Sequence, residues 1–150
     1  NGRALEFASD QLKNDHEIVL AAVTRYGDAL QYASQGLKND HEIVLAAVTQ
    51  NGLALQFASS ALRKDRNIVL TAITQNCCAL EYANEELQND REIVLAAVTQ
   101  NVNAFKYPSQ ELKDDREIVL AALVAPCGLN LEYASQELKN DREIVLTQNG

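Results

Sequence analysis

The chain consists of six copies of one phrase, and this periodicity limits its possible folds more than any other feature. The phrase Asp-x-x-Ile-Val-Leu recurs at steps of 25 residues, with a last step of 26, and begins at Asp15, Asp40, Asp65, Asp90, Asp115 and Asp141. Self-similarity at a fixed period of this size is typical of repeat arrays, in which each repeat packs on its neighbours. We therefore expect a single array over residues 1–150, with units at about 1–26, 27–51, 52–76, 77–101, 102–126 and 127–150. Because Asn-Gly stands at both ends, we interpret the chain as a segment of a longer protein or as a mature form trimmed from one.

The phrase itself predicts an α-helix. Asp40 is suited to cap the helix, because its carboxylate can accept hydrogen bonds from the first free amides, and Glu42 favours the positive end of the helix dipole. The run 43–48 is apolar on every side, which predicts a helix that is buried all round. Asn51 and Gly52 predict a left-handed turn that ends it.

The residues between two copies of the phrase predict a second helix of about ten residues, at 53–62 in the third unit. Its apolar positions Ala54, Leu55, Ala58 and Leu62 fall on one helical stripe. Helices this short are not stable alone in water, so each pair must bury its apolar face on the next pair. We expect an all-α fold, an α-solenoid of six two-helix repeats with about twelve short helices in two layers. The residues expected to be almost wholly buried include Leu45, Val48, Leu55 and Leu70.

A strand-containing repeat is the alternative. Ile-Val-Leu has strand character, and leucine-rich repeats have periods of about 20–29 residues. Leu45, Val48 and Asn51 match the leucine-rich pattern only in part. The alanine pair at 46–47 favours helix, so the two-helix repeat is our main interpretation.

Net charge and cysteine content restrict the partners and the compartment. A formal charge of −8 disfavours nucleic acids and anionic membrane surfaces, which need clustered Lys and Arg, and favours a neutral or basic protein partner. Insertion of this chain into a membrane is not expected, because no apolar run approaches about 18 residues. Cys77 and Cys127 lie two repeats apart, roughly 20 Å, so an intrachain disulfide is not expected. A reducing intracellular compartment, the cytosol or an organelle interior, is favoured.

The repeated phrase also resembles a known family. The stretch from Asp90 to Asn101, followed by a phrase of the Ala-Leu-Glu-Tyr-Ala type, is similar to a 25-residue helical repeat known only as a domain of unknown function, the DUF4116 type, which is abundant in protist and algal proteins. The resemblance extends over the whole chain and implies a helical repeat, but no catalytic residues or cofactor. The chain departs from the pattern at Cys77, Val102, Pro108 and in the truncated last copy.

Residues with chemical potential all have a simpler structural explanation. The Asp-Arg-Glu triplets could bind a partner, but helix capping and weak ion pairs between repeats explain them better. His16 and His41 occupy positions where other copies have Arg, which favours solvated residues over acid–base groups. The pair Cys77 and Cys78 has no neighbouring base to activate a nucleophile. Too few His and Cys residues stand at ligand spacing for a zinc site. We therefore expect no enzyme activity, no metal site and no cofactor.

One aromatic residue recurs in each unit. Phe and Tyr interchange at this position, and the net charge disfavours a platform for stacking bases, so we expect these rings to fill the core between repeats. The row comprises Phe7, Tyr32, Phe57, Tyr82, Tyr107 and Tyr133.

The positions that differ between copies are the candidates for a partner surface, because repeats specify partners where packing does not fix the residue. They lie at the start of the first predicted helix of each unit and one turn later, and the candidates are Arg3, Asp28, Leu53, Cys78, Asn103, Leu129, Lys106 and Pro108. We expect a non-catalytic scaffold that binds another macromolecule, most readily a protein. The alternative is a structural or linker subunit built into a large complex, such as an organellar or photosynthetic membrane assembly.

Three departures from the repeat lie close together. Pro108 falls inside a predicted helix, which must kink or begin later. Val102 replaces the glycine of the predicted turn, so Asn101 must adopt the left-handed conformation or the turn must change. Pro126 and an inserted residue lengthen the next junction. We predict that units five and six are rotated or displaced relative to units one to four, and that this bend contacts a partner.

Overall fold

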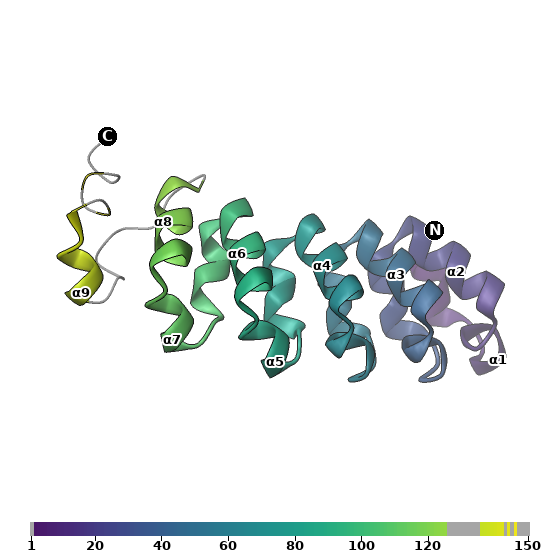
Figure 1. Ribbon diagram of the computed structural model, residues 1–150. Coiled ribbons are helices and arrows are strands. Elements are labelled where there is room, and N and C mark those ends of the chain that lie inside the picture. Colours follow the sequence, from purple (N-terminus) through teal and green to yellow (C-terminus); the bar gives the residue numbers. More distant parts are fainter. Residues whose placement is uncertain (1, 126–135, 143, 145, 147–150) are drawn as a thin grey trace. The chain divides into compact units, whose positions relative to one another are not determined.

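The computed structural model describes residues 2–125, 136–142, 144 and 146, with the side chains of residues 2, 3, 136 and 137 left aside (Figure 1). The chain divides into two compact units, Asn1–Asn84 and Glu85–Gly150. Every element assigned in the described residues is helical, as the repeat predicts. The first unit holds η1 (Gly2–Phe7), α1 (Asp10–Lys13), α2 (His16–Arg25), η2 (Gly27–Tyr32), η3 (Leu37–Asn39), α3 (His41–Gln50), η4 (Gly52–Phe57), η5 (Leu62–Lys64), α4 (Arg66–Gln75) and η6 (Cys77–Tyr82), where η marks a 3-10 helix. The second holds α5 (Glu85–Gln88), α6 (Arg91–Gln100), η7 (Val102–Lys106), α7 (Gln110–Lys113), α8 (Arg116–Val124) and α9 (Gln136–Lys139).

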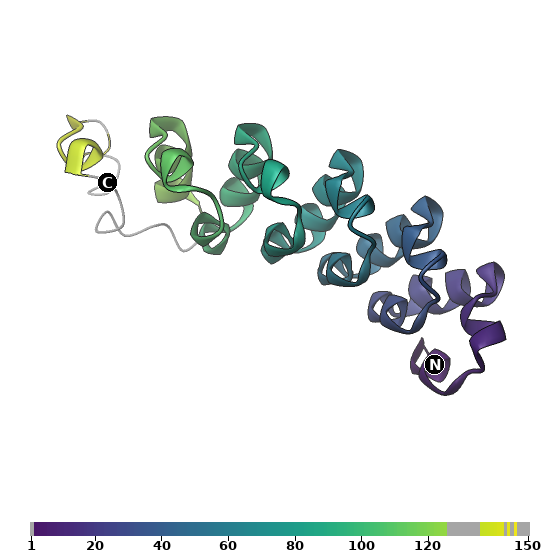
Figure 2. The same cartoon turned by 90° about the horizontal axis from the view of Figure 1, so that it is seen from below.

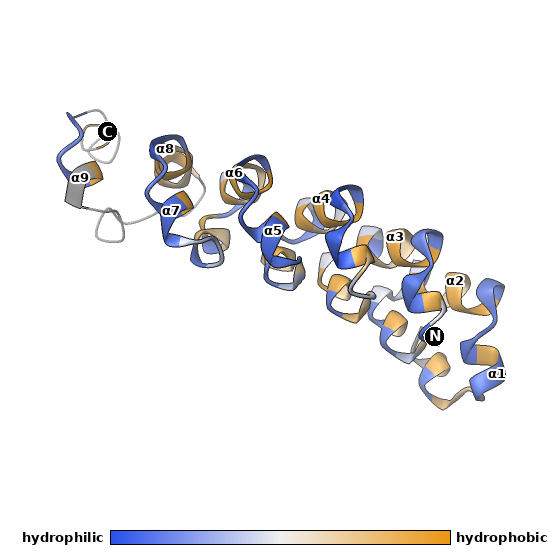
Figure 3. Cartoon of the chain, turned by 60° about the horizontal axis from the view of Figure 1, so that its bottom comes forward, coloured by the Kyte–Doolittle hydropathy of each residue, from blue (hydrophilic) through white to orange (hydrophobic). Residues whose placement is uncertain are grey.

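The long α-helices form one layer of each unit, and the 3-10 helices of five or six residues form the other. In the first unit α2, α3 and α4 lie side by side, and η1, η2, η4 and η6 do the same (Figure 2). Each of η2 and η4 also packs on the long helix before it and on the one after it. In the second unit α6 packs on α8 and on η7. Figure 3 shows apolar residues in the bodies of the helices and hydrophilic residues where the short helix passes into the long one.

The predicted aspartate caps are confirmed. The side chain of Asp40 accepts a hydrogen bond from the Ile43 amide at 3.0 Å, and Asp65 accepts from the amides of Asn67 and Ile68. Each cap has extended backbone angles while the following residue is helical. The same arrangement recurs at Asp15, Asp90, Asp115 and Asp141.

The second predicted helix is not continuous. In the third repeat it consists of η4 and η5, separated by residues 58–61. The first of these, Ala58, has an extended backbone with φ −68° and ψ 156°. The following Ser59 accepts a hydrogen bond from the Leu62 amide through its hydroxyl at 3.3 Å, and its own amide donates to the carbonyl of Lys38, one repeat earlier, at 2.9 Å. The serine is therefore a helix cap that also links two repeats, and this double role breaks the helix.

The predicted left-handed turn at Asn51 and Gly52 is wrong. Asn51 is extended, with φ −147°, and its side chain accepts a hydrogen bond from the Leu53 amide at 3.1 Å. Glycine is required for space instead: a Cβ atom on Gly52 would lie 2.1 Å from the carbonyl oxygen of Ala72. The glycine thus lets η4 approach the long helix of its own repeat.

Burial is less complete than the apolar run predicts. Ile43, Val44 and Val48 are fully buried, and so is Leu55 in the 3-10 layer. Leu45 and Leu70, which were predicted to be almost wholly buried, are only half-buried. Successive side chains of an α-helix point about 100° apart around its axis, so three neighbours cannot all face the core. Here Ile43 and Val44 face the neighbouring elements, and Leu45 lies on the flank of the helix.

The aromatic row does not form the core either. Phe7 is 85 % exposed, and four rings are half-buried, namely Tyr32, Phe57, Tyr82 and Tyr107. Tyr133 lies outside the described residues. The core between the layers is filled by the residue two positions before each ring, such as Leu30, Leu55, Leu80 and Phe105.

The departures in the fifth repeat have smaller local effects than predicted. Asn101 is extended, with φ −159°. Its counterparts Tyr26, Asn51 and Asn76 are extended as well, and none of these four residues adopts a left-handed turn. Pro108 lies between η7 and α7, at the position where Ala58 stands in a regular repeat. Neither a kinked helix nor a first-turn proline results. The predicted rotation or displacement of the fifth and sixth repeats stays a prediction.

Candidate functional site

Within each unit, a ladder of contacts between basic and acidic side chains joins the starts of successive long helices. In each of its rungs the basic residue after an aspartate cap lies near the cap of the next repeat. Arg91 donates from Nε to Asp115 at 2.8 Å and also pairs with Glu117. His16 Nε2 lies 3.7 Å from Asp40 and 3.6 Å from Glu42. Further rungs join His41 to Asp65 and Arg116 to Asp141.

The ladder affects the titration of its acids. The hydrogen bond from Arg91 holds the pKa of Asp115 below its usual value. Partial burial of the carboxylate opposes this shift, and the hydrogen bonds that it accepts from the amides of Ile118 and Glu117 add to it. The Arg91 side chain is about half exposed, so water and salt weaken the attraction. These side chains fit the structural explanation given above, in which capping and ion pairing between repeats account for the triplets.

The residues that vary between copies form a strip on the layer of 3-10 helices in the first unit. Because 3-10 helices have about three residues per turn, the second and fifth positions of each η helix share one side. The η helices lie side by side, so these positions follow one another across the layer. We call the set Asp28, Gln31, Leu53, Gln56, Cys78 and Glu81 the variable strip.

The variable strip is polar, acidic and partly ordered by its own hydrogen bonds. Gln31 donates from Nε2 to the carbonyl of Asp28, and Gln56 donates in the same way to the carbonyl of Leu53, both at 3.1 Å. Asp28 also accepts from Asn51 Nδ2 at 2.8 Å. Gln56 and Glu81 are exposed and the other four residues are half-buried.

The remaining candidates belong to other parts of the chain. Asn103 and Lys106 are exposed on η7 in the second unit, and Lys106 Nζ lies 4.7 Å from the centre of the Tyr107 ring. Pro108 is buried and therefore cannot offer a contact surface. The Arg3 side chain and Leu129 lie outside the described residues.

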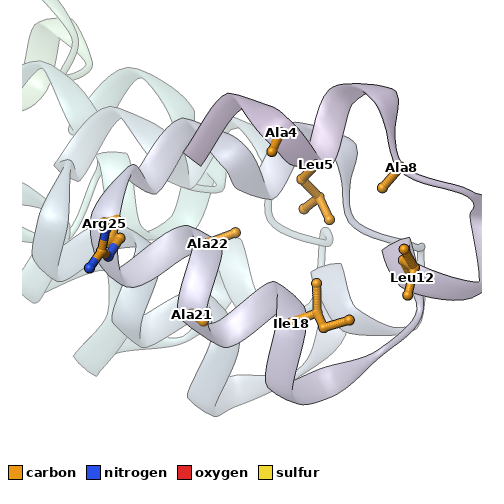
Figure 4. Close-up of a pocket in the computed structure, with 8 residues that line it drawn as sticks. All are labelled: Ala4, Leu5, Ala8, Leu12, Ile18, Ala21, Ala22 and Arg25. Carbon is orange, nitrogen blue, oxygen red and sulfur yellow. The ribbon is translucent and has the colours of Figure 1, made fainter. Parts of the chain in front are cut away.

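Sequence reasoning missed two exposed regions. One is the start of the short helix in each repeat, where the residues also differ between copies and are exposed, as at Gln35, Gly36, Ser60, Ala61, Glu85 and Glu86. Comparison of the copies at these positions could have found it. The other is a groove of about 400 Å³ beside η1 and α2, lined by Ala4, Leu5, Ala8, Leu12, Ile18, Ala21, Ala22 and Arg25 (Figure 4). Only a comparison of burial between repeats reveals it.

The cysteine pair is unsuited to nucleophilic chemistry. Burial, together with the adjacent Cys78, raises the pKa of the Cys77 thiol to about 11. A thiol with such a pKa holds little thiolate at neutral pH. Both thiols are free, and Cys127 lies outside the described residues.

The described residues lack two further features, a metal site and a membrane span. No group of three or more His, Cys, Asp or Glu side chains is placed to hold a metal ion in that part of the chain. In the same part, no helix has the length and apolar character needed to cross a membrane.

Comparison with known proteins agrees with the repeat architecture. The model of the family described as "Domain of unknown function (DUF4116)" matches residues 1–38, 19–63, 65–113 and 127–147. No curated protein and no solved structure matches the chain. Because the family matches cover nearly all of the sequence, and the described residues form repeated helical units, the chain belongs to the DUF4116 family.

Proposed function

We propose that this protein is a non-catalytic scaffold that binds another protein through the variable strip. The observation that supports the proposal is that different positions of the repeat have different roles. Residues that are identical or nearly so in the copies serve the core, the caps and the ladder, whereas the strip varies on neighbouring helices and remains accessible. Variation on a fixed, rigid framework is how repeat proteins acquire specificity.

The chemistry of the strip suggests the partner. It presents exposed amide and carboxylate groups at Gln56 and Glu81 beside the half-buried Leu53. Together with the net charge of −8, this favours a partner surface that carries Lys or Arg around a small apolar contact. Nucleic acid is not proposed, because the strip offers no cluster of basic residues to neutralise phosphates.

A structural or linker subunit of a larger assembly is the second candidate. Exposed apolar side chains favour it, since Phe7 is 85 % exposed and Val124 is 69 % exposed. In this candidate they belong to surfaces that other subunits cover, since large exposed apolar patches mark interaction sites. In this candidate several faces of the chain would be covered at once, whereas a scaffold uses mainly the strip.

Site-specific photocrosslinking in cells that produce the protein natively tests the proposal. A photoreactive residue replaces Gln56 in the strip, and in a matched variant it replaces Thr74, which is exposed on α4 in the other layer. The scaffold predicts a discrete protein adduct from position 56 that weakens when Glu81→Lys reverses the local charge. Adducts of equal strength from both positions favour the built-in subunit, and no adduct from position 56 contradicts the scaffold.

A further inference from the structure

We propose that the ladder in the first unit is a pH-sensitive latch, in which protonation of His16 and His41 strengthens the contacts between successive long helices. The two histidines begin α2 and α3, and their acidic partners belong to the starts of α3 and α4. The proposal goes beyond the binding function and does not depend on it, because no residue of the variable strip takes part. It rests on the residue type at the ladder position, on the distances and on the neighbouring charges.

The ladder position holds histidine in two copies of the repeat and arginine in the other four. The arginines are Arg66, Arg91, Arg116 and Arg142. Arginine keeps its positive charge at every physiological pH. Histidine is the side chain whose charge ordinarily changes between about pH 5 and pH 8. The rungs that begin at His16 and His41 can therefore gain or lose a charge where an arginine rung cannot.

The distances in these two rungs make the contact depend on the charge of the ring. His16 Nε2 lies 3.7 Å from Asp40 and 3.6 Å from Glu42, and His41 Nε2 lies 3.8 Å from Asp65. These separations exceed the roughly 2.7–3.2 Å of an N–H···O hydrogen bond, so a neutral ring makes no such bond. The attraction between two full charges falls only with the inverse of their distance, so a protonated ring attracts the carboxylates from where it lies.

The surroundings of the two rings are negative on balance. α2 packs on η1, α1, η2 and α3, and α3 packs on α2, η2, η3, η4 and α4. Along the chain each ring stands between two acids and follows a lysine by three residues. Apart from Asp40, Glu42 and Asp65, the acids on these elements form no ion pair with either ring in the described part of the chain. The remaining charged or titratable residues of these elements and their caps are Arg3, whose side chain is not described, Glu6, Asp10, Lys13, Asp15, Glu17, Arg25, Asp28, Tyr32, Lys38 and Arg66.

Protonation of the two rings stabilises the folded chain, because the carboxylates lie beside the rings only when the repeats are stacked. Carboxyl groups ordinarily remain ionised above about pH 4, so both members of each rung are charged at about pH 5. The stabilisation is therefore present on the acid side of the histidine range and is lost as pH rises toward about 8. Both histidine side chains are about half exposed, so solvent limits the gain to about fivefold in the opening equilibrium of each junction between long helices.

The second unit supplies an internal reference with permanent charges. Arg91 Nε lies 2.8 Å from Asp115, and Arg116 Nε lies 2.8 Å from Asp141. Both rungs are charged throughout the histidine range, because arginine does not lose its proton there. The junction between α6 and α8, which pack together, should therefore not respond to pH between about 5 and 8. One chain thus carries a pH-sensitive section and a section with fixed charges.

Glu42→Gln tests the acidic partner in the first rung. Glu42 is changed rather than Asp40, because Asp40 also caps α3. Glu6→Gln is the matched control, since it removes the same charge from an exposed residue of η1, which also packs on α2. Amide hydrogen exchange should show a weaker pH response of α2 in the first variant and the wild-type response in the control. Equal responses of the two variants contradict the pairing of His16 with Glu42.

Substitution of both histidines separates the effect of their charge from that of other groups. A chain with His16→Arg and His41→Arg carries a permanent cation in both rungs and should be well protected from exchange throughout the range. A chain with His16→Gln and His41→Gln carries neutral polar side chains there and should be less protected throughout. Circular dichroism checks that both variants fold. If either variant keeps the wild-type pH response, another group titrates and the proposal is wrong.

Hydrogen–deuterium exchange of the whole wild-type chain at about pH 5.5 and about pH 7.5 is the decisive measurement, because it reports local opening element by element. After correction for the intrinsic pH dependence of exchange, the protection of α2 and α3 should be greater at the lower pH, by up to about fivefold for each rung. The protection of α6 should be equal at the two pH values. The same pH response in α2, α3 and α6, or no response in α2 and α3, overturns the proposal.

Discussion

A Cβ atom placed on Gly52 would lie 2.1 Å from the carbonyl oxygen of Ala72, a distance that no side chain tolerates. The same relationship joins Gly27 to Ala47, at 2.5 Å. Each glycine begins a 3-10 helix, and each alanine lies within the long helix of the same repeat. The close approach of backbone to backbone therefore sets the spacing of the two layers in the second and third repeats, whereas Cys77 and Val102 occupy the same position in the fourth and fifth.

Gly52→Ala should destabilise the chain. Its Cβ meets a backbone carbonyl that cannot rotate away, so the helices must separate, at a cost of about 1–3 kcal/mol. Gly36→Ala is the matched control, because Gly36 has helical angles of φ −60° and ψ −46° and its Cβ would meet only Ser34 Oγ, at 3.8 Å. The control should be neutral or gain about 0.4–1 kcal/mol. Urea unfolding measures both, and equal effects would show that the layers can shift freely.

The order of burial along the long helix predicts an order of mutational effects. Ile43→Ala removes a fully buried side chain and should cost about 2–5 kcal/mol. Leu45→Ala removes a half-buried one and should cost less than about 2 kcal/mol, because part of its surface is already in water. Thermal unfolding ranks the two variants. The reverse order would mean that another molecule or repeat covers Leu45 in solution.

The sequence predicted those features that depend on one helix or on a fixed period. The caps such as Asp40 and the helical class follow from local hydrogen bonding and from the apolar pattern, which a single repeat contains. The features that it missed depend on neighbours. Ser59 breaks a helix because its amide donates to the preceding repeat, and Gly52 is needed because of a carbonyl twenty residues away. The exposure of Ile18 is likewise visible only when its repeat is placed beside the others.

Asp90→Ala should cost about 0.5–2 kcal/mol, because the amides of Glu92 and Ile93 lose the acceptor that caps α6. Asp90→Asn is the control that keeps an acceptor at the cap, so it should retain most of the stability. Chemical unfolding measures both variants, and partner crosslinking from position 56 should be unchanged. Lost crosslinking with unchanged stability would make Asp90 a contact residue.

The ion pair between Arg91 and Asp115 should make stability depend on pH. The pKa of Asp115 is lower in the folded chain than its ordinary value, so folding favours the ionised form. The stabilisation is therefore complete above the unfolded pKa of about 4 and is lost as pH falls through the folded pKa. Asp115→Asn keeps a capping side chain but cannot ionise, so it should lose less stability than the wild type between about pH 6 and pH 3.

Asp114→Asn is the matched control for this pH dependence, since Asp114 is exposed and its carboxylate accepts from Gln110 of the same turn. This variant removes one negative charge from the residue beside Asp115 and keeps the contact between Arg91 and Asp115. Urea unfolding at the two pH values should give the wild-type pH dependence for this control. The interpretation fails if the two variants respond to pH alike.

Pro108→Ala distinguishes a proline that breaks a helix from one placed where the helix already ends. A proline inside a helix costs about 3 kcal/mol, so its removal would stabilise the chain by that amount. The counterpart Ala58 has φ −68°, which suits a proline ring, and its amide donates to the Leu55 carbonyl at 3.1 Å. Replacing Pro108 regains one such hydrogen bond, worth about 0.5–1.5 kcal/mol. The substitution also frees the unfolded chain, which lowers stability by about 0.4–1 kcal/mol. It removes the contacts of a buried ring as well. We therefore expect a small change without net stabilisation in thermal unfolding, and a gain near 3 kcal/mol would show that the proline strains the fifth repeat.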